Sequence, residues 1–269
     1  MKVGFIGIGN MASAIIEGMI QNGHTSPQDI YVNNTTKEKL SLFTSETGTQ
    51  ACSSNKELVG KVDVLVLAAK PNVFPTILAE IKDEIAIHQP LVVSIAAGTS
   101  LQKLSDLLKN GNETAIIRVM PNLNSQIGEG MTAICGNGYI TSQQKEFVLT
   151  MFKAIGEVVE LPEKDFSTFT AIAGSSPAFV FLFIDSLARA AVRNGMSKEV
   201  ATRIAAQAVL GSGKLVLDSK ETPWNLIDQV SSPGGTTVEG ILALEDTGFS
   251  SSVTKAVQAV IDKDQKMMR

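Results

Sequence analysis

The chain opens with a strand, a tight glycine turn and a helix in direct succession. The apolar run Lys2–Ile6 predicts a short buried strand, and the periodic residues of Ala14–Ile20 predict a helix. Between them lies Gly7-Ile8-Gly9-Asn10-Met11-Ala12, which has the spacing Gly-x-Gly-x-x-Ala. In this setting the first glycine permits the turn, the second lets a pyrophosphate approach the backbone, and the alanine allows close helix–strand packing. These residues predict a dinucleotide site, although a tight turn without a ligand would also accommodate them.

The residues after the second strand indicate which dinucleotide binds. The strand Asp29–Val32 is followed by Asn33, Asn34, Thr35, Thr36 and Lys37. Sites that prefer NAD usually place an acid at this strand end to bind the ribose 2′-hydroxyl, and no acid stands here. We expect the amides, hydroxyls and lysine to receive a 2′-phosphate instead, so that NADPH is preferred and NADH is the alternative cofactor. Taken alone, Lys37 also fits an ordinary solvated lysine at a helix start.

The first half of the chain continues as an alternation of strands and helices, which predicts a doubly wound parallel sheet. Further strands are expected at Val62–Ala68, Leu91–Ile95, Ala115–Val119, Met131–Cys135 and Gly156–Glu160. Helices are expected at Lys37–Thr47, Lys56–Gly60, Asn72–Lys82, Ser100–Lys109 and Ser142–Ala154. We therefore predict an α/β fold, with a Rossmann-type dinucleotide-binding domain over residues 1–163.

Small or turn-forming residues directly follow three of these strands. Doubly wound sheets bind their ligands beyond the carboxyl ends of the strands. We expect these loops to line the cofactor's ribose and nicotinamide, although each loop alone is also compatible with a plain turn. The residues are Ala69, Lys70 and Pro71 in the first loop, Ala97 and Gly98 in the second, and Met120 and Asn122 in the third.

From about Lys164 the pattern is helical to the end of the chain, which predicts an all-helical second domain over residues 164–269. Helices are expected at Phe166–Ala173, Ala178–Asn194, Lys198–Leu217, Trp224–Gln229, Thr236–Asp246 and Ser251–Lys266. The stretches Phe179–Val192 and Ile204–Leu217 are apolar on more than one face, so they must be buried. Because a small helical domain has little interior, we expect a homodimer or higher homo-oligomer joined through the C-terminal helices.

A hydroxyl-rich glycine turn, Val-Ser-Ser-Pro-Gly-Gly-Thr-Thr, occupies Val230–Thr237. The periodic apolar run Val238–Leu244 follows it, so the turn leads into a helix N-terminus. Free backbone N–H groups and the helix dipole favour an anion there, and hydroxyl side chains add neutral donors. The turn therefore predicts a site for a small carboxylate, or else an ordinary helix cap. The residues that would form it are Ser231, Ser232, Gly234, Gly235, Thr236 and Thr237.

Composition argues against several other classes of protein. A net charge of −4 disfavours a nucleic-acid partner. Cys52 and Cys135 lie far apart, with neither metal spacing nor a disulfide pattern, so we expect no metal and two buried thiols. Glycines break the first apolar run, which indicates a strand rather than a signal peptide, and the apolar run Pro177–Val192 is interrupted by two charges. We expect a soluble cytoplasmic protein without a membrane segment.

In chain order, these landmarks resemble those of the pyrroline-5-carboxylate reductase family. The resemblance extends essentially end to end and is most specific in the Ser-Pro-Gly-Gly-Thr-Thr turn. It implies NAD(P)H-dependent reduction of 1-pyrroline-5-carboxylate to proline, the last step of proline biosynthesis, by dimers with swapped C-terminal helices and often by larger rings. The matching segments are Gly7–Ala12, Ala69–Pro71, Arg118–Asn122, Ala173–Ala178 and Val230–Thr237.

The chemistry of this reaction fits the predicted turn. A protonated cyclic imine is already electrophilic, so the reaction needs a hydride at carbon and a hydrogen bond or proton at nitrogen. No strongly basic side chain is required, and the protein supplies orientation and electrostatics. On this reading the backbone of Gly234, Gly235 and Thr236 holds the carboxylate beside Ser232. Thr237 Oγ1 bonds the imine nitrogen as the catalytic group, and a partner subunit completes the site.

The chain departs from the usual family pattern in places. Gly174-Ser175-Ser176-Pro177 stands where Gly-Ser-Gly-Pro is usual, which affects the loop expected between the domains. Asn34 stands where arginine is common, which weakens the NADPH preference. Leu123-Asn124-Ser125 replaces the usual Thr-Pro.

Two alternatives stay open at this point. A β-hydroxyacid dehydrogenase would carry a catalytic lysine early in the long helix of the second domain, and Pro177–Phe183 contains none. A non-catalytic regulatory relative would keep the fold and the nucleotide, although the intact glycine motif and the intact pair Thr236-Thr237 disfavour it.

Overall fold

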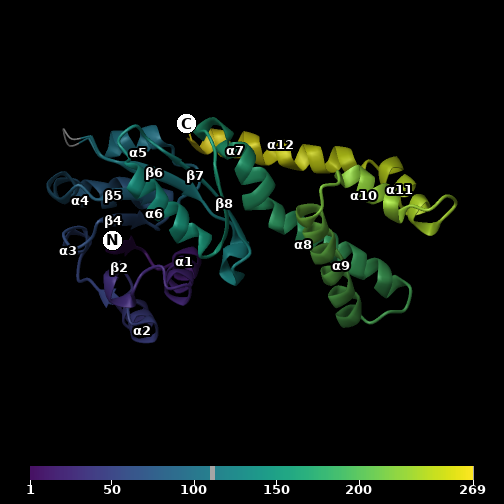
Figure 1. The fold of residues 1–269 in the computed structure, drawn as a ribbon, viewed down its shortest axis with the longest axis horizontal. Coiled ribbons are helices and arrows are strands. Elements are labelled where there is room, and N and C mark those ends of the chain that lie inside the picture. The colour runs from purple at the N-terminus through teal and green to yellow at the C-terminus, as the bar shows by residue number, and fades with distance from the viewer. Residues whose placement is uncertain (110–112, 269) are drawn as a thin grey trace. The chain divides into compact units, whose positions relative to one another are not determined.

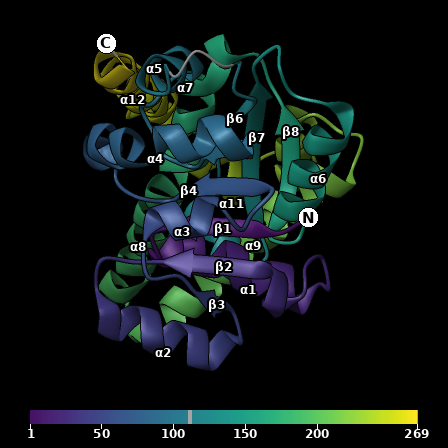
Figure 2. The ribbon, with the colours of Figure 1, turned by 90° about the vertical axis from the view of Figure 1, so that its left-hand side faces the viewer.

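The computed structural model describes residues 1–109 and 113–268. In this part of the chain, one 8-stranded sheet has the order β3-β2-β1-β4-β5-β6-β7-β8. Figure 2 shows β2, β1 and β4 side by side. The strands are β1 (Val3–Ile6), β2 (Ile30–Asn33), β3 (Gln50–Ala51), β4 (Val64–Leu67), β5 (Leu91–Ser94), β6 (Ile116–Met120), β7 (Gly130–Gly136) and β8 (Gly156–Glu160).

The strand order reverses at β1, which has β2 on one side and β4 on the other. Strands β1 to β6 are parallel to one another, as predicted from the buried apolar runs. A reversal of this kind opens a crevice beyond the carboxyl ends of the two central strands, where doubly wound sheets bind their ligands. The glycine motif follows β1 directly and therefore lies at this switch point.

The expectation of a wholly parallel sheet is wrong at its far edge, where β7 runs antiparallel to β6. Between these strands lies only a loop with the short 3-10 helix η3 (Leu123–Ile127), and a parallel neighbour would need a longer crossover. The helix α6 (Ser142–Lys153) supplies such a crossover between β7 and β8, which are parallel to each other. The sequence analysis also missed β3, a two-residue strand whose exposed residues show no apolar pattern.

Helices cover both faces of the sheet (Figure 1). One face buries Val3, Phe5, Val64 and Val66 against α1 (Asn10–Gln21), α2 (Lys37–Thr47) and α6. The other buries Leu65, Leu67 and Val92 against α3 (Asn55–Val59), α4 (Phe74–His88) and α5 (Leu101–Leu107). Strands buried on both faces must be apolar along their whole length, which explains their near-continuous hydrophobic sequence.

After β8 the chain is helical. The predicted loop at 174–177 is wrong, because a helical run continues through it: α7 (Phe166–Phe169), the π-helical turn η5 (Thr170–Ser175) and α8 (Ser176–Arg193). The wider turn precedes Pro177, which sits at the start of α8, where a missing N–H is tolerated. The remaining helices are α9 (Lys198–Asp218), α10 (Pro223–Val230), α11 (Thr236–Asp246) and α12 (Phe249–Met268).

The chain divides into two compact units, one of Met1–Gly174 with Val260–Arg269 and one of Ser175–Ala259. Helix α12 therefore begins in the second unit and ends in the first. The predicted domain division at residues 163 and 164 remains a prediction.

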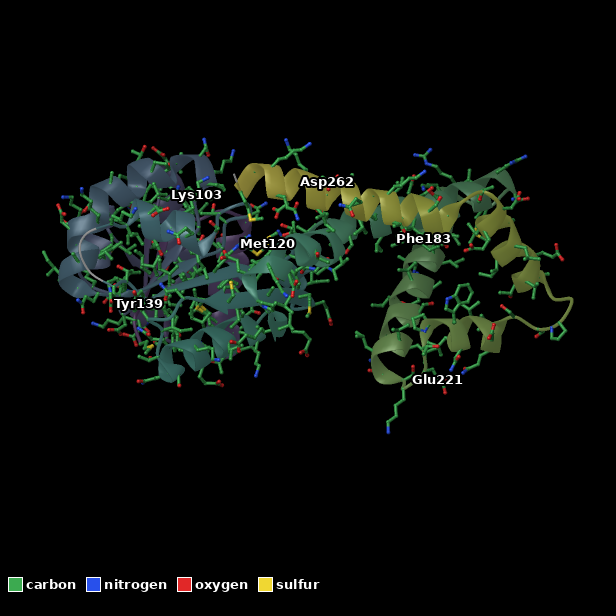
Figure 3. All side chains as sticks on the ribbon, turned by 90° about the horizontal axis from the view of Figure 1, so that it is seen from above. Lys103, Met120, Tyr139, Phe183, Glu221 and Asp262 are labelled. Carbon is green, nitrogen blue, oxygen red and sulfur yellow. The ribbon has the colours of Figure 1, made fainter. Side chains whose placement is uncertain are left out.

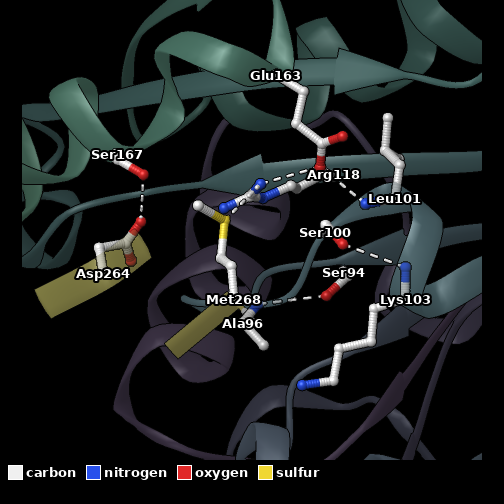
Figure 4. A network of polar contacts seen from close by, with 10 residues as sticks. All are labelled: Ser94, Ala96, Ser100, Leu101, Lys103, Arg118, Glu163, Ser167, Asp264 and Met268. Atoms are coloured by element: carbon white, nitrogen blue, oxygen red, sulfur yellow. Dashed lines mark hydrogen bonds and ion pairs between the residues drawn. The ribbon is translucent and has the colours of Figure 1, made fainter. Parts of the chain in front are cut away.

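The end of α12 is anchored within the first unit by polar contacts (Figure 4). Ser167 Oγ donates a 2.8 Å hydrogen bond to Asp264 Oδ2, and both residues are buried. Arg118, which is only 1% exposed, pairs with Glu163 Oε1 at 2.9 Å and donates to Met268 Sδ at 3.7 Å. The last turns of the chain are thus an integral part of the first unit.

The second unit exposes much of its apolar surface. In α8 only Pro177 and Ala188 are buried, whereas Leu182 is 68% exposed. In α9, Leu217 is 85% exposed. Phe183, labelled in Figure 3, and Phe249 have ring centroids 6.0 Å apart within this unit. The apolar faces predicted from the sequence are therefore present, and the single chain leaves them uncovered.

One helical run, Glu163–Arg193, is long and apolar enough to cross a membrane by length and composition alone, within the part of the chain that is described. A single run of this kind is weak support for a membrane span, because helices that cover their apolar faces with protein pass the same test. Asp185 in this run forms an ion pair with Arg189 at 2.5 Å. The absence of a membrane segment remains an expectation.

Candidate functional site

A cavity of about 840 Å³ lies beyond the carboxyl ends of β1, β2 and β4. It occupies the switch point of the sheet, entirely within the first unit. Many of the residues predicted to bind a dinucleotide line this cavity together: Gly7, Ile8, Gly9, Asn33, Asn34, Thr35, Lys37, Ala69 and Lys70.

The two glycines of the motif differ in what requires them. Gly7 has φ +101°, and a Cβ there would lie 3.0 Å from the carbonyl oxygen of Ala68, so the fold itself requires glycine. A Cβ on Gly9 would meet no protein atom within 4 Å, and its φ of −84° suits any residue. The fold therefore leaves open the space above Gly9, which is what a bound pyrophosphate would use.

The N-terminus of α1 faces this space without a side-chain cap. Gly9 is its N-cap residue and makes no side-chain cap bond, and the first turn contains no acid. The backbone donors of Asn10, Met11 and Ala12 are therefore available to an anion, which the helix dipole also favours. Ala12 is 1% exposed and packs in the core, as predicted for the third position of the motif.

The lining of the cavity carries a net positive charge. Lys37, Lys39 and Lys70 line it, and Glu80 is its only acid among the described residues. Lys37 Nζ donates to the Ser53 carbonyl oxygen at 3.3 Å, which holds the ammonium group at the wall rather than free in solvent. This balance suits a ligand with phosphate groups.

The side chain of Asn34 forms hydrogen bonds that position the glycine turn. Its Oδ1 accepts a 3.3 Å hydrogen bond from the N–H of Ile8, and its Nδ2 donates to the Thr36 carbonyl oxygen at 3.3 Å. The side chain thus ties the end of β2 to the glycine turn.

Sequence reasoning missed part of the wall, including Ser53, Ser54, Asn55, Thr76 and Glu80. Ser53 to Asn55 follow β3, which is too short to recognise from its pattern, and Thr76 and Glu80 lie on α4. The pairing of β3 with β2 brings this segment to the cavity. The sequence feature that could have identified Ser53 to Asn55 is that they form a run of polar residues.

Ionic contacts hold this missed segment in place. Glu57 Oε2 accepts from the N–H of Ser53 at 2.7 Å and from its hydroxyl at 2.6 Å, while Lys61 Nζ donates to Oε1 at 2.6 Å. The Lys61 hydrogen bond first, and then the Ser53 bonds, lower the pKa of Glu57 to about 2. Glu57 is therefore ionised at all physiological pH values and keeps Ser53 at the wall.

Several predicted cofactor residues are not part of the cavity wall. Asn122 is buried, and its amide is fully used within the protein: Nδ2 donates to the Ala173 carbonyl at 3.0 Å, and Oδ1 accepts from the Met131 N–H at 3.0 Å. Gly98 has φ +68°, and a Cβ there would meet Met267 of α12 at 3.3 Å. The cofactor roles expected for these residues and for Pro71, Ala97 and Met120 remain predictions.

Both cysteines are buried and free, as expected. Burial raises the pKa of the Cys135 thiol to about 12, and nearby Glu163 adds to the effect. The thiol is therefore protonated and unreactive at neutral pH.

The hydroxyl-rich turn lies in the second unit, between α10 and α11. Gly234 has φ +67°, and a Cβ on Gly235 would lie 2.9 Å from the Ser232 carbonyl oxygen. The N–H of Gly235 donates to that same carbonyl at 2.9 Å, which closes the turn. Both glycines are thus required by this backbone.

Helix α11 starts as α1 does, with glycine at the N-cap and no side-chain cap. Thr236 and Thr237 are its first two residues, and within residues 1–109 and 113–268 neither hydroxyl makes a hydrogen bond. The alternative that these hydroxyls simply cap the helix is therefore not what the geometry shows. The free N–H groups and unpaired hydroxyls at the N-terminus of α11 are suited to binding an anion.

The fold and the cavity define a dinucleotide-binding protein of the oxidoreductase type. Residues 2–98 match the family described as NADP oxidoreductase, coenzyme F420-dependent, and residues 163–267 match the pyrroline-5-carboxylate reductase dimerisation family. The chain is 38% identical to the pyrroline-5-carboxylate reductase of Escherichia coli K12, over 100% of this chain and 98% of that one. It belongs to the pyrroline-5-carboxylate reductase family.

Solved structures agree with this assignment. A 1-pyrroline-5-carboxylate reductase from Streptococcus pyogenes has a TM-score of 0.88 at 36% identity, over 99% of this chain and 98% of that one. A pyrroline carboxylate reductase from Plasmodium falciparum, with NADP bound, has a TM-score of 0.90 at 33% identity, over 100% and 98% of the two chains.

Proposed function

We propose that this chain reduces 1-pyrroline-5-carboxylate to proline with NADPH, as the final step of proline biosynthesis. Two uncapped helix N-termini, each preceded by glycine, support this function most directly. One of them, at α1, borders the lysine-lined cavity, and the other, at α11, begins in the hydroxyl-rich turn. Each offers backbone donors to an anion, as a pyrophosphate and a small carboxylate would require.

The cofactor fits the residues at the switch point. The backbone of Gly9 to Ala12 would hold the pyrophosphate, and Lys37 with Thr35 would face a 2′-phosphate at the end of β2. NADPH, when bound, supplies a hydride equivalent to the imine carbon. The protein contributes the position of the reactants and the electrostatic environment.

The substrate fits the turn before α11. The backbone N–H groups of Gly234, Gly235 and Thr236, with the hydroxyl of Ser232, would bind the carboxylate. The hydroxyl of Thr237 would hydrogen-bond the ring nitrogen, which carries a proton in the protonated imine and keeps it in the secondary amine of proline. A partner subunit would complete this site.

We expect NADPH to be used more efficiently than NADH, because the end of β2 carries amides, hydroxyls and lysine in place of an acid. A spectrophotometric assay of cofactor oxidation with pyrroline-5-carboxylate gives kcat/KM for each cofactor. A clear preference for NADH would show that the end of β2 does not receive a 2′-phosphate. Folded protein without turnover on either cofactor would instead favour a regulatory role.

We also propose a homodimer or higher homo-oligomer joined through the C-terminal helices of residues 164–269. The match of 163–267 to a dimerisation family supports this, as do the exposed apolar side chains of α8 and α9. Light scattering at micromolar concentration is expected to give at least twice the chain mass of 28.6 kDa. A monodisperse monomer would contradict both the interface and the shared substrate site.

A cytoplasmic location is part of the same proposal. Two buried free thiols are consistent with a reducing compartment. Fractionation of cells that produce the protein tests it.

A further inference from the structure

A chain of three polar side chains, which we call the amide relay, lies on the wall of the cofactor cavity. Its members are Asn33 at the end of β2, Asn55 at the start of α3 and Glu80 on α4. Asn33 Nδ2 donates to Asn55 Oδ1 at 2.7 Å, and Asn55 Nδ2 donates to Glu80 Oε2 at 3.0 Å. Three elements that are separate in the sequence therefore share one directed series of hydrogen bonds.

The carboxylate fixes the direction of this series. An ionised glutamate only accepts hydrogen bonds, so Asn55 must turn its amino group toward Glu80. Its carbonyl oxygen then faces Asn33, which must in turn present its own amino group to Asn55. Consequently the carbonyl oxygen of Asn33 is the group left over at the other end of the relay.

That oxygen has no partner in the protein. Asn33 Oδ1 is buried and makes no hydrogen bond within the described part of the chain. A buried acceptor without a donor is unfavourable, and this one belongs to a residue that lines the cavity. A phosphate cannot satisfy it, because a phosphate is itself an acceptor, whereas a sugar hydroxyl can.

We propose that Glu80 is a positioning residue, which orients both amides so that Asn33 accepts a hydrogen bond from a ribose hydroxyl of the cofactor. This inference rests on the proposed function, because it concerns the same cavity. The hydroxyl is one that NADH and NADPH both carry, so the relay contributes to binding of either cofactor. The preference for NADPH over NADH depends instead on the neighbouring lysine and hydroxyls.

The relay is suited to mutational analysis because Glu80 is exposed and its hydrogen bond adds little to folding. We expect Glu80→Ala to weaken binding of NADPH and NADH by roughly three- to tenfold, the value of one hydrogen bond. The melting temperature should not change. Kd is measured by titration of cofactor fluorescence. Glu84→Ala is the matched control, because Glu84 lies one turn along α4, pairs with Lys56 at 3.2 Å and is not part of the cavity wall.

A compensating pair of substitutions tests the direction of the relay. Asn33→Asp places an acceptor at both ends of Asn55, which can no longer satisfy them in line, so the new carboxylate is held less well than the amide that it replaces. Adding Glu80→Gln supplies a donor at the far end, and Asn55 can then turn over. We expect the double variant Asn33→Asp/Glu80→Gln to bind NADH at least threefold more tightly than Asn33→Asp alone. NADH is the decisive probe, because the new acid would also repel a 2′-phosphate.

The outcomes separate this inference from the proposed function. If the wild-type protein binds neither cofactor, the proposed function fails along with the relay. If it binds cofactor but the effects of Asn33→Asp and Glu80→Gln simply add, the relay is wrong and the proposed function stands. Equal losses in Glu80→Ala and Glu84→Ala would also overturn the relay.

Discussion

Gly9→Val is expected to abolish measurable NADPH binding while the protein stays folded. The open space above Gly9 means that valine meets no protein atom near its Cβ, and its φ of −84° is normal for any residue. The side chain would instead occupy the place of the pyrophosphate. A hundredfold rise in Kd corresponds to a loss of about 2.8 kcal/mol. Titration of NADPH fluorescence measures it.

Gly138→Val is the control for this experiment. Gly138 follows β7, which is separated from β1 by three strands, and a Cβ there also meets nothing within 4 Å. We expect wild-type affinity in the control and a stability cost of about 1 kcal/mol or less for Gly9→Val, because valine is a poor N-cap residue. Unchanged affinity in Gly9→Val would mean that the glycine turn binds no cofactor. Substitution of Gly7 would not distinguish these cases, since Gly7 is required by the backbone.

Thr237→Val is expected to lower kcat/KM by roughly ten- to a hundredfold, with little change in stability or in NADPH affinity. Valine keeps the branched shape and removes only the hydroxyl. A hydrogen bond to a charged group contributes about 1.5–3 kcal/mol, and such a loss in the transition state gives this range of rates. Steady-state kinetics with pyrroline-5-carboxylate, together with a melting curve, measures both quantities.

The structure sharpens this test, because Thr237 is not the cap of α11. The N-cap residue is Gly235, so loss of the hydroxyl should not destabilise the helix. Thr236→Val is the matched control, for which we expect a smaller effect, since Thr236 is assigned a role through its backbone. Wild-type turnover with a lowered melting temperature would remove Thr237 from the catalytic residues.

What the sequence predicts well is local. The turn at Gly7 to Ala12 was predictable because its geometry depends on residues that are adjacent in the sequence. The buried strands were predictable because burial on both faces requires an unbroken run of apolar residues. The strand at β7 was predicted, but its antiparallel direction was not, because strand direction depends on the connection to β6, which leaves no trace in the apolar pattern of Gly130–Gly136. Glu80 was missed for a similar reason, because α4 reaches the cavity only once the sheet has assembled.

The residue type alone also says little about whether a polar side chain is already hydrogen-bonded within the protein. Asn33 and Asn122 were both expected to bind cofactor. Among the described residues, Oδ1 of Asn33 has no hydrogen-bond partner, whereas both ends of the Asn122 amide are bonded within the protein. The difference depends on distant backbone groups at Met131 and Ala173, which only the folded chain brings near.

The anchoring of α12 has a consequence for biosynthesis on the ribosome. The first unit includes the turns after Val260, which are translated only after the whole of the second unit, Ser175–Ala259. Until then Ser167 has no carboxylate to bind, and Arg118 lacks its contact with Met268. A nascent chain therefore cannot complete the first unit when residues 1–174 have been translated, and this unit stays unfinished until the turns after Val260 have also emerged.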